Sequence, residues 1–325
     1  MRAIVIKQYG GPEVLTIEER PDPIPTRDQV LVDVKAFGLN HAETYFRSGA
    51  WGNVAEITGI ECVGTVRHDP GKLFHSGEKV AAIVGGMGRS LNGSYAESVA
   101  VPRSNVVAFR SDLPWETLAA IPESYATAWT ALIGILKVKS GDTVLIRGAT
   151  SALGQAAVNI AVGVNARVLA TTRKRERAAL LREIGAHETF IDAPDLSMRV
   201  RALYREGIDA VLDVVGNTTV LDSLAALRRG GTACEVGFLG GGGPLTLEPV
   251  FQIPSDRHFT TFASALVTGG AEFPLEEIPF QAIFDRVAVG KYKARPARVF
   301  KFDEIQEAHR VMEAGTVTGK LVVTV

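Results

Sequence analysis

Residues 142–173 form the segment whose residue types and spacing best suit a defined chemistry. The run Gly148-Ala-Thr-Ser-Ala-Leu-Gly154 is a turn of small residues. It follows the apolar, β-branched run Asp142–Arg147 and precedes Gln155–Val162, where apolar residues recur at helical spacing. A second strand is predicted at Arg167–Thr172. This order of strand, turn, helix and strand is the unit that places a dinucleotide pyrophosphate at a helix N-terminus.

The turn departs from the usual Gly-x-Gly-x-x-Gly pattern of dinucleotide-binding proteins. Aligned on Gly154, the other glycine positions hold Thr150 (or Ala149) and Ser151, so that only the packing glycine remains. An ordinary strand-to-helix turn of an α/β protein is the alternative interpretation. The predicted phosphate contacts are the turn residues Thr150, Ser151, Ala152 and Leu153.

Composition narrows the class of protein. At 325 residues the chain is long enough for two domains, and its 46% hydrophobic content and net charge of −1 are those of a soluble globular protein. Near-neutral charge predicts neither a nucleic-acid partner nor an anionic membrane surface. Two cysteines, Cys62 and Cys234, exclude a disulfide framework and a four-cysteine zinc site. No secretory signal and no bilayer-spanning run is recognised, which predicts a cytoplasmic protein.

Two patterns of predicted secondary structure divide the chain. Up to about residue 120, short strand-like runs alternate with Gly, Pro and Asn turns, which indicates an all-β, barrel-like domain; the runs are Ala3–Lys7, Leu15–Glu18, Gln29–Ala36, Gly64–Val66, Lys79–Ile83, Ala96–Val101 and Val106–Ala108. After helices at Glu116–Ala120 and Ser124–Leu136, about six strands alternate with helices up to His258–Phe262, with the fifth strand at Thr232–Val236. That alternation predicts a parallel sheet with right-handed crossovers.

The tail after Ala263 is too short to form a domain. It carries predicted helices at Pro279–Val289 and Phe302–Ala314 and predicted strands at Ala297–Phe300 and Lys320–Val325. We therefore expect the tail to return to the N-terminal β domain. The prediction is an α/β protein with a discontinuous β domain, residues 1–122 and 262–325, and a nucleotide-binding domain, residues 123–261.

Several motifs in a fixed order resemble the medium-chain dehydrogenase/reductase superfamily, and within it the zinc-free, zeta-crystallin-like quinone oxidoreductase branch. The motifs begin at Tyr9, Gly38, Gly59, Gly77, Gly207 and Gly315, and read YGGPEVL, GLNHAETYFRSG, GIECVGTV, GEKV, GIDAVLDVVG and GTVTGKL. The resemblance covers nearly the whole chain. It implies a GroES-like β domain plus a Rossmann doubly wound sheet, with NAD(P)H in the cleft between them and usually a homodimer.

The sequence also predicts whether the chain binds zinc as related dehydrogenases do. Zinc alcohol dehydrogenases of this superfamily carry a cysteine ligand in a Gly-x-Cys segment and a histidine ligand in a Gly-His-Glu segment. The matching positions here are Asn40 and Ile60, which are unsuited to binding zinc. His41 and Cys62 are potential substitutes, but Cys62 is adjacent to Glu61 in a strand and neighbours in a strand face opposite ways. We therefore expect no metal site.

The cofactor prediction follows from charge. NAD-specific Rossmann domains end their second strand with an acid that binds the ribose 2′-hydroxyl, whereas this chain has Thr172 and Arg173 there. A hydroxyl and a guanidinium suit a 2′-phosphate, and Arg177 would add positive charge, so NADPH is predicted. A solvated basic helix start is the alternative interpretation. Asp192 is discordant, because an inward-pointing acid there would weaken this preference.

The resemblance implies the remaining contacts. Asn40 and Tyr45 would be catalytic, with Asn40 bonding the nicotinamide ribose or the substrate carbonyl. Arg47 would support a reacting group or face solvent. Trp51 and Phe238 would line the substrate pocket. The further cofactor contacts would be Thr127, Val215, Gly216, Gly237, Phe238 and Lys320.

Without a metal, hydride transfer to a quinone or an α,β-unsaturated carbonyl is easier than oxidation of an unactivated alcohol, because the developing charge is delocalised. A proton from Tyr45 or water would complete the reduction. The alternatives are a zinc-dependent alcohol dehydrogenase of the same superfamily and a non-catalytic NADPH-binding protein.

Overall fold

The computed structural model describes residues 1–325, which form two compact units. Residues 1–126 and 265–325 make the first unit, and residues 127–264 make the second. The sequence predicts these boundaries after residues 122 and 261, a few residues earlier in each case. None of the helices combines the length and the apolar character needed to cross a bilayer.

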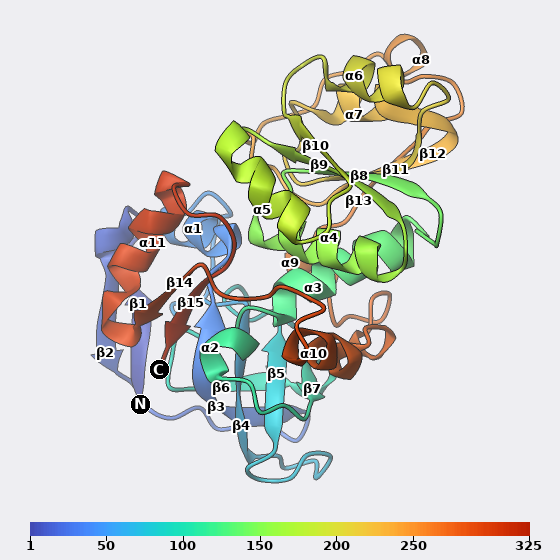
Figure 1. Ribbon diagram of the computed structural model, residues 1–325. Coiled ribbons are helices and arrows are strands. Elements are labelled where there is room, and N and C mark those ends of the chain that lie inside the picture. Colours follow the sequence, from blue (N-terminus) through green and yellow to red (C-terminus); the bar gives the residue numbers. More distant parts are fainter. The chain divides into compact units, whose positions relative to one another are not determined.

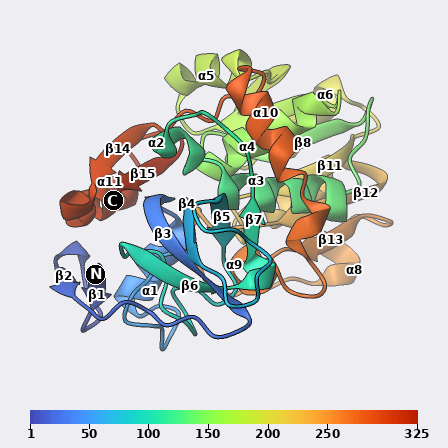
Figure 2. The same ribbon diagram turned by 90° about the horizontal axis from the view of Figure 1, so that it is seen from below.

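The first unit is built on a seven-stranded, mostly antiparallel sheet and a two-stranded sheet. The larger sheet has the order β14-β15-β3-β4-β5-β7, with β6 paired to β3, and the smaller one joins β1 to β2 (Figures 1 and 2). The strands are β1 (Arg2–Ile6), β2 (Leu15–Glu19), β3 (Gln29–Gly38), β4 (Glu61–His68), β5 (Lys79–Ile83), β6 (Ser98–Pro102), β7 (Val106–Ala108), β14 (Arg298–Lys301) and β15 (Leu321–Thr324).

The C-terminal tail completes this unit. Strand β15 pairs antiparallel with β3 and parallel with β14. Val323 and Phe300 of the tail pack in the same apolar core as Val32 and Val80. The helices of the unit are α1 (His41–Ser48), α2 (Trp115–Leu118), α10 (Phe280–Ala288) and α11 (Ile305–Ala314), with α3 (Pro122–Trp129) and α9 (Ser264–Val267) at the two boundaries. The tail therefore returns to the β domain, as the sequence predicts.

The second unit contains a six-stranded, all-parallel sheet of order β10-β9-β8-β11-β12-β13. This is the order of the doubly wound Rossmann fold. Figure 1 shows α4 and α5 on one face of the sheet and α6 and α7 on the other. The elements are β8 (Thr143–Arg147), α4 (Ala152–Gly163), β9 (Arg167–Thr172), α5 (Ala178–Glu183), β10 (Glu188–Ile191), α6 (Leu196–Leu203), β11 (Ile208–Asp213), α7 (Val220–Ala226), β12 (Leu227–Glu235), α8 (Pro249–Gln252) and β13 (His258–Thr261).

Two predicted elements differ from the structure. The helix predicted at 124–136 is α3 followed by π-helical winding at Thr130–Ile135, where Leu136 N–H bonds Ala131 O at 2.9 Å. Strand β12 begins at Leu227, not at the predicted Thr232, because the strand continues through Gly230 and Gly231. Gly230 has a positive φ of 72°, and the register of β12 on β11 shifts nearby, so the glycines accommodate a bulge.

Candidate functional site

The predicted dinucleotide turn has the geometry that its small residues suggest. Ser151 caps α4, because its Oγ accepts the Gly154 N–H at 3.0 Å. The N–H groups of Ala152 and Leu153 have no acceptor within the chain. A Cβ on Gly154 would lie 2.5 Å from the Gly148 carbonyl oxygen, so only glycine lets α4 approach the turn this closely. Free N–H donors at the N-terminus of a 12-residue helix suit a diphosphate.

The loops after β11 and β12 also lie at the carboxyl end of the sheet. The Val215 and Gly216 N–H groups both donate to Asp213 Oδ1, at 2.9 and 3.0 Å. Gly216 has φ 90°, and a Cβ there would lie 2.5 Å from the Gly237 carbonyl oxygen. Glycine at position 216 therefore lets the two predicted contact loops pack together, with the Phe238 side chain half-buried beside them. Parallel sheets of this type bind ligands at this end.

The basic segment after β9 presents its charges to solvent. Arg173, Lys174 and Arg175 are exposed, and none of the three forms an ion pair. Thr172 is buried, and its hydroxyl bonds the backbone of Lys174 through Oγ1···O at 3.1 Å and N···Oγ1 at 3.2 Å. Its hydroxyl therefore shapes the turn instead of standing free for a phosphate. Arg177 is half-buried, and Thr127 of α3 is buried.

The discordant acid Asp192 is neutralised. Its carboxylate accepts two hydrogen bonds from the guanidinium of Arg147, at 2.7 and 3.0 Å. Arg147 ends β8 and its side chain is only 1% exposed. The inward-pointing carboxylate that would weaken the NADPH prediction thus has a buried cation as its partner.

A second group of polar side chains lies in the first unit, where three residues far apart in the sequence meet. The Lys320 ammonium lies 2.5 Å from Glu61 Oε1 and 2.6 Å from Asn40 Oδ1. Asn40 Nδ2 in turn donates to Glu61 Oε1 at 2.9 Å. The Glu61 and Lys320 side chains are 0% and 4% exposed. Buried charges of this kind persist only when they are paired.

Glu43 adds a second buried carboxyl to this group. It lies in the first turn of α1, where its Oε2 accepts the Asn40 backbone N–H at 2.6 Å and its Oε1 accepts the Ile60 N–H at 3.2 Å. Burial raises the pKa of Glu43 to about 8, with Glu61 adding to the rise, while Lys320 and the hydrogen bonds oppose it. The group therefore contains the Glu61 carboxylate, the Lys320 ammonium and a Glu43 carboxyl that carries a proton at neutral pH.

The hydrogen-bond donors of Asn40 are not available to a ligand. Both hydrogens of its Nδ2 are engaged, one by Glu61 and one by Glu43 at 3.3 Å. Asn40 therefore has no donor left for a substrate carbonyl, and only its Oδ1 retains a lone pair. Lys320 has two engaged N–H groups and keeps a third.

Tyr45 and Arg47, both on α1, have different surroundings. Tyr45 is half-buried, its ring stacks on Trp51 with centroids 6.1 Å apart, and burial raises the pKa of its phenol, which keeps it a proton donor. Arg47 is buried and does not face solvent. Its guanidinium pairs with Glu313 and bonds His309 Nδ1 at 3.2 Å, so it joins α1 to α11.

His309 is fully buried in this contact. Its Nε2 lies 3.0 Å from the Tyr95 hydroxyl, and because Arg47 can only donate, the imidazole accepts at Nδ1 and donates at Nε2. Burial, together with the charge of Arg47, lowers the pKa of His309 to about 3.

We expect His309 to make the fold acid-sensitive. Its pKa is depressed in the folded state, so the unfolded chain binds one more proton between about pH 3 and 6.5. Stability contributed by neutral His309 should be complete above pH 6.5 and fall by about 1.4 kcal/mol per pH unit below it. Urea unfolding of His309→Gln should show a flatter acid limb than the wild type. The exposed His75, changed to Gln, is the control and should leave the slope unchanged.

The residues at the zinc-ligand positions do not fit a zinc ion. Asn40 is engaged as described, and Ile60 is an apolar side chain that is 1% exposed. Cys62 packs in the apolar core, and burial raises the pKa of its thiol, which disfavours the thiolate that zinc requires. Glu61, on the opposite face of the strand, pairs with Lys320. No group of three or more His, Cys, Asp or Glu side chains is arranged to hold a metal.

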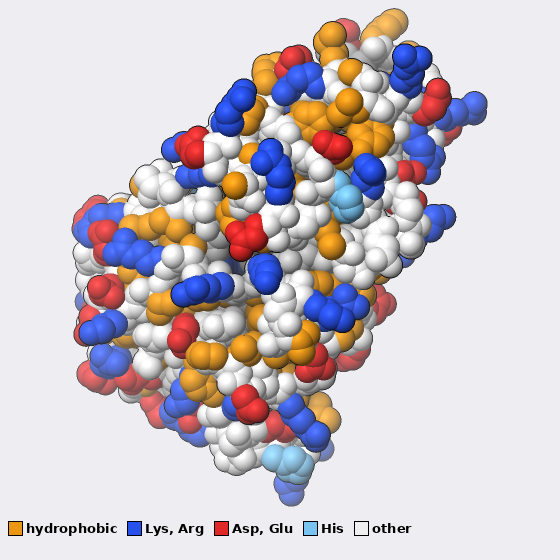
Figure 3. Space-filling view, in the orientation of Figure 1, with side chains coloured by type: hydrophobic (Ala, Val, Ile, Leu, Met, Phe, Trp, Pro, Cys, Tyr) orange, Lys and Arg blue, Asp and Glu red, His pale blue; other side chains and the backbone are white.

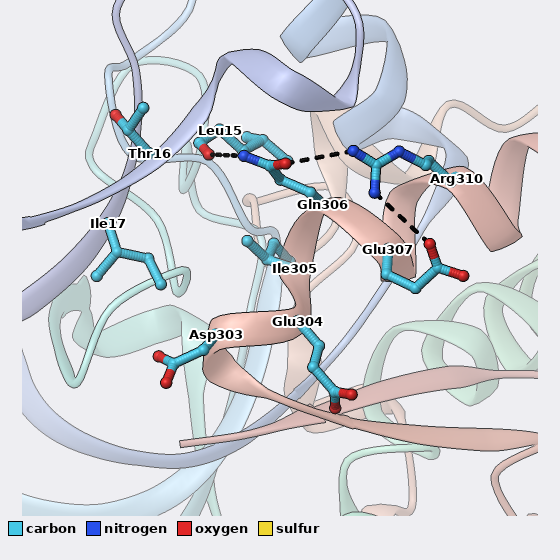
Figure 4. Close-up of a pocket in the computed structure, with 9 residues that line it drawn as sticks. All are labelled: Leu15, Thr16, Ile17, Asp303, Glu304, Ile305, Gln306, Glu307 and Arg310. Carbon is cyan, nitrogen blue, oxygen red and sulfur yellow. Dashed lines mark hydrogen bonds and ion pairs between the residues drawn. The ribbon is translucent and has the colours of Figure 1, made fainter.

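A separate hollow of about 500 Å³ lies between β2 and the start of α11 (Figure 4). Gln306 crosses it to donate to the Leu15 carbonyl oxygen at 3.0 Å. No predicted site residue lines this hollow. On the face drawn in Figure 3, Lys and Arg side chains lie among Asp and Glu side chains, with no single basic field.

Known proteins place these features in a family. Residues 26–111 match the model of the alcohol dehydrogenase GroES-like domain, and residues 152–274 match that of the zinc-binding dehydrogenase domain. The chain is 30% identical to the quinone oxidoreductase of Rattus norvegicus over 252 residues, which cover 74% of each protein. This chain therefore belongs to the medium-chain dehydrogenase/reductase superfamily, in its quinone oxidoreductase branch.

Solved structures of similar proteins support the same family assignment. A mycobacterial protein crystallised with NADPH is 29% identical and matches the whole of both chains with a TM-score of 0.86. An NAD-dependent alcohol dehydrogenase, also 29% identical over the whole of both chains, has a TM-score of 0.83. These similarities support an oxidoreductase with a nicotinamide cofactor.

Three functional residues, Glu43, Glu61 and Arg147, are not predicted from the sequence. Glu61 and Arg147 are charged residues within or beside apolar runs, which is a signal that could have found them. An unpaired charge cannot be buried without large loss of free energy, so such positions signal a hidden partner. The sequence does not say which residue that partner is.

Proposed function

We propose that this protein is an NADPH-dependent reductase of quinones or α,β-unsaturated carbonyl compounds that works without zinc. The observation that carries the proposal is the exposed, ion-pair-free segment Arg173–Arg175 directly after β9. In a Rossmann fold this position meets the adenosine ribose, and positive charge there favours a 2′-phosphate over a 2′-hydroxyl. Asp192 would repel a 2′-phosphate if it were unpaired, but its charge is neutralised by Arg147.

The second unit supplies the cofactor-binding groups. The free N–H groups of Ala152 and Leu153 suit the pyrophosphate, with Thr150 and Ser151 forming the turn beside them. The proposed contacts from the other strand ends are Thr127, Val215, Gly216, Gly237 and Phe238. Those for the 2′-phosphate are Arg173 and Arg177, with Thr172 shaping the turn that presents them.

The first unit supplies the groups for the reacting end. Bound NADPH provides the hydride, and one further proton completes reduction of a quinone to a hydroquinone or of an enone to a saturated carbonyl. Tyr45, or a water molecule, donates that proton, and the raised pKa keeps the phenol protonated. Lys320 stabilises developing negative charge with its remaining N–H, and Asn40 orients Lys320.

A charge-reversal variant tests the cofactor choice. Arg173→Glu should weaken NADPH binding by about 10- to 100-fold, because one charge-assisted hydrogen bond contributes about 1.5–3 kcal/mol. NADH binding should change little. Calorimetric titration of both nucleotides is the measurement, and Arg205→Glu, at another exposed arginine of the second unit, is the control. Equal losses for both nucleotides would contradict the assignment.

Two experiments separate the alternative functions. Stopped-flow mixing of the NADPH complex with a panel of quinones and alkenals distinguishes a reductase, which oxidises the nucleotide, from a non-catalytic NADPH-binding protein. Elemental analysis of active protein after chelator treatment distinguishes the proposed mechanism from a zinc-dependent alcohol dehydrogenase. Stoichiometric zinc that is required for turnover would overturn the zinc-independent mechanism.

We further propose a homodimer formed through the second unit. Strand β13 is an edge of its sheet, and an unpaired edge offers backbone groups to a second copy. Val250 and Phe251 of the preceding helix α8 are 88% and 87% exposed. Phe251→Glu should shift the protein toward monomer in light scattering, whereas Met198→Glu, at a 74% exposed position on α6, should not.

A further inference from the structure

The Arg147–Asp192 pair lies beside the segment that we assign to the 2′-phosphate. Asp192 follows β10 directly, and its backbone N–H donates to the Thr172 carbonyl oxygen at 2.9 Å. Arg173 is the next residue after Thr172. The Asp192 side chain is 11% exposed, so the carboxylate is mostly buried and near the carboxyl end of the sheet.

The carboxylate of Asp192 is bound on both oxygens. Arg147 Nη2 and Nε donate to Oδ1 at 2.7 and 3.0 Å, and Nε also lies 3.3 Å from Oδ2. Thr171 Oγ1 donates to Oδ2 at 3.0 Å. A guanidinium that spans a carboxylate in this way fixes both its orientation and its charge.

Arg147 is itself held in place by a second acid. Its Nη1 donates to Asp222 Oδ2 at 2.8 Å, to Ser223 Oγ at 3.2 Å and to the Thr219 carbonyl oxygen at 3.3 Å. These contacts come from α7 and the residue before it. The arginine therefore cannot swing out to solvent without losing contacts on both sides.

The same pair is linked to the dinucleotide turn. The Gly148 N–H donates to Thr171 Oγ1 at 3.0 Å, and that hydroxyl donates to Asp192. Gly148 is the residue after Arg147, so the backbone turn, Thr171, Asp192 and the Arg147 side chain form a closed ring of contacts. The position of Asp192 is thereby coupled to the start of the turn.

We propose that Arg147 is a specificity-determining positioning residue: by holding Asp192 in a buried ion pair, it keeps that carboxylate from competing for the nucleotide ribose. The inference rests on the proposed binding of NADPH. An unpaired acid at this place would repel a 2′-phosphate and accept a hydrogen bond from a 2′-hydroxyl. The pair thus maintains selection for the phosphorylated nucleotide, although Arg147 does not touch it.

A double-mutant cycle tests the proposal. Calorimetry would measure NADPH and NADH affinities for the wild type, Arg147→Met, Asp192→Asn and the double variant. In Arg147→Met, the NADPH-to-NADH affinity ratio should fall by about tenfold, since Asp192 is left without its cation. The ratio should stay at or above the wild-type value in Asp192→Asn and return toward it in the double variant. A purely structural role for Arg147 would weaken both nucleotides alike and leave the ratio unchanged.

The outcomes separate the two proposals. A wild type that binds neither nucleotide overturns the proposed function and this inference with it. A wild type that binds NADPH, combined with an unchanged ratio in folded Arg147→Met, overturns the inference alone. If Arg147→Met does not fold, Arg147→Lys, which keeps the charge but not the two-pronged contact, replaces it in both the single and the double variant. The affinity ratio should fall in Arg147→Lys but not in Arg147→Lys/Asp192→Asn, and equal ratios in these two variants would overturn the inference.

Discussion

Replacing Lys320 with methionine is expected to destabilise the protein by about 3–5 kcal/mol, because the change leaves a buried carboxylate without its cation. Glu61 is fully buried, and the Lys320 ammonium, 2.5 Å from its Oε1, is its cationic partner. Glu43 lies within the same network and its pKa is raised to about 8. The loss should therefore be larger at pH 9 than at pH 6, since Glu43 becomes a second unpaired charge as it deprotonates. Urea unfolding at both pH values is the measurement.

Two variants control this experiment. Lys7→Met removes an ion pair with Glu18 in which the lysine is 64% exposed, and it should leave the stability nearly unchanged because solvent screens exposed pairs. The double variant Lys320→Met/Glu61→Gln removes both charges and should recover much of the loss. A Lys320→Met variant no less stable than Lys7→Met would show that the buried network does not depend on its lysine.

Placing a methyl group at Gly154 is expected to disable the dinucleotide turn. The Cβ of Gly154→Ala would lie 2.5 Å from the Gly148 carbonyl oxygen and 2.6 Å from the Ala149 Cα, so α4 must move away from the turn. Overpacking of this kind destabilises by about 1–3 kcal/mol. The free N–H groups of Ala152 and Leu153 would move with the helix, and loss of one charged hydrogen bond weakens binding by about tenfold or more. Calorimetric titration with NADPH is the measurement.

The matched control is another glycine of the same unit. In the π-helical stretch, a Cβ on Gly134 would meet only the Thr130 Cγ2, at 3.7 Å, which is ordinary contact. Gly134→Ala should therefore retain NADPH affinity and be as stable as the wild type or slightly more so. Similar losses in both variants would mean that the close approach at Gly154 is not what maintains the turn.

The sequence predicted the architecture because local patterns carry it. The strand, small-residue turn and helix at 142–162 appear as β8, the turn and α4, and Gly154 is the residue that packing requires. The tail was assigned to the first unit by its length alone, and β15 does pair with β3. The predicted start of β12 at Thr232 is wrong, because Gly230 and Gly231 lie within the strand and accommodate a bulge there.

The partners of single side chains are less predictable from the sequence. Asn40 is predicted to bond the nicotinamide ribose or the substrate carbonyl, and because Glu61 and Glu43 engage both of its Nδ2 hydrogens, only its Oδ1 remains for such a bond. Arg47 was expected near a reacting group or at the surface, but it is buried against His309 and Glu313. Each role depends on a partner contributed by a distant segment, and spacing along the chain does not report such partners.

The sequence by itself determined the two kinds of domain, the doubly wound sheet and the basic end of β9, since periodicity, small residues and charge act over a few neighbouring positions. Only the tertiary structure decided which buried charges meet: Lys320 with Glu61, and Arg147 with Asp192. The physical reason is that burial makes an unpaired charge very unfavourable, so these residues demand a partner. Which residue serves is fixed only when strands far apart in the chain come together in one sheet.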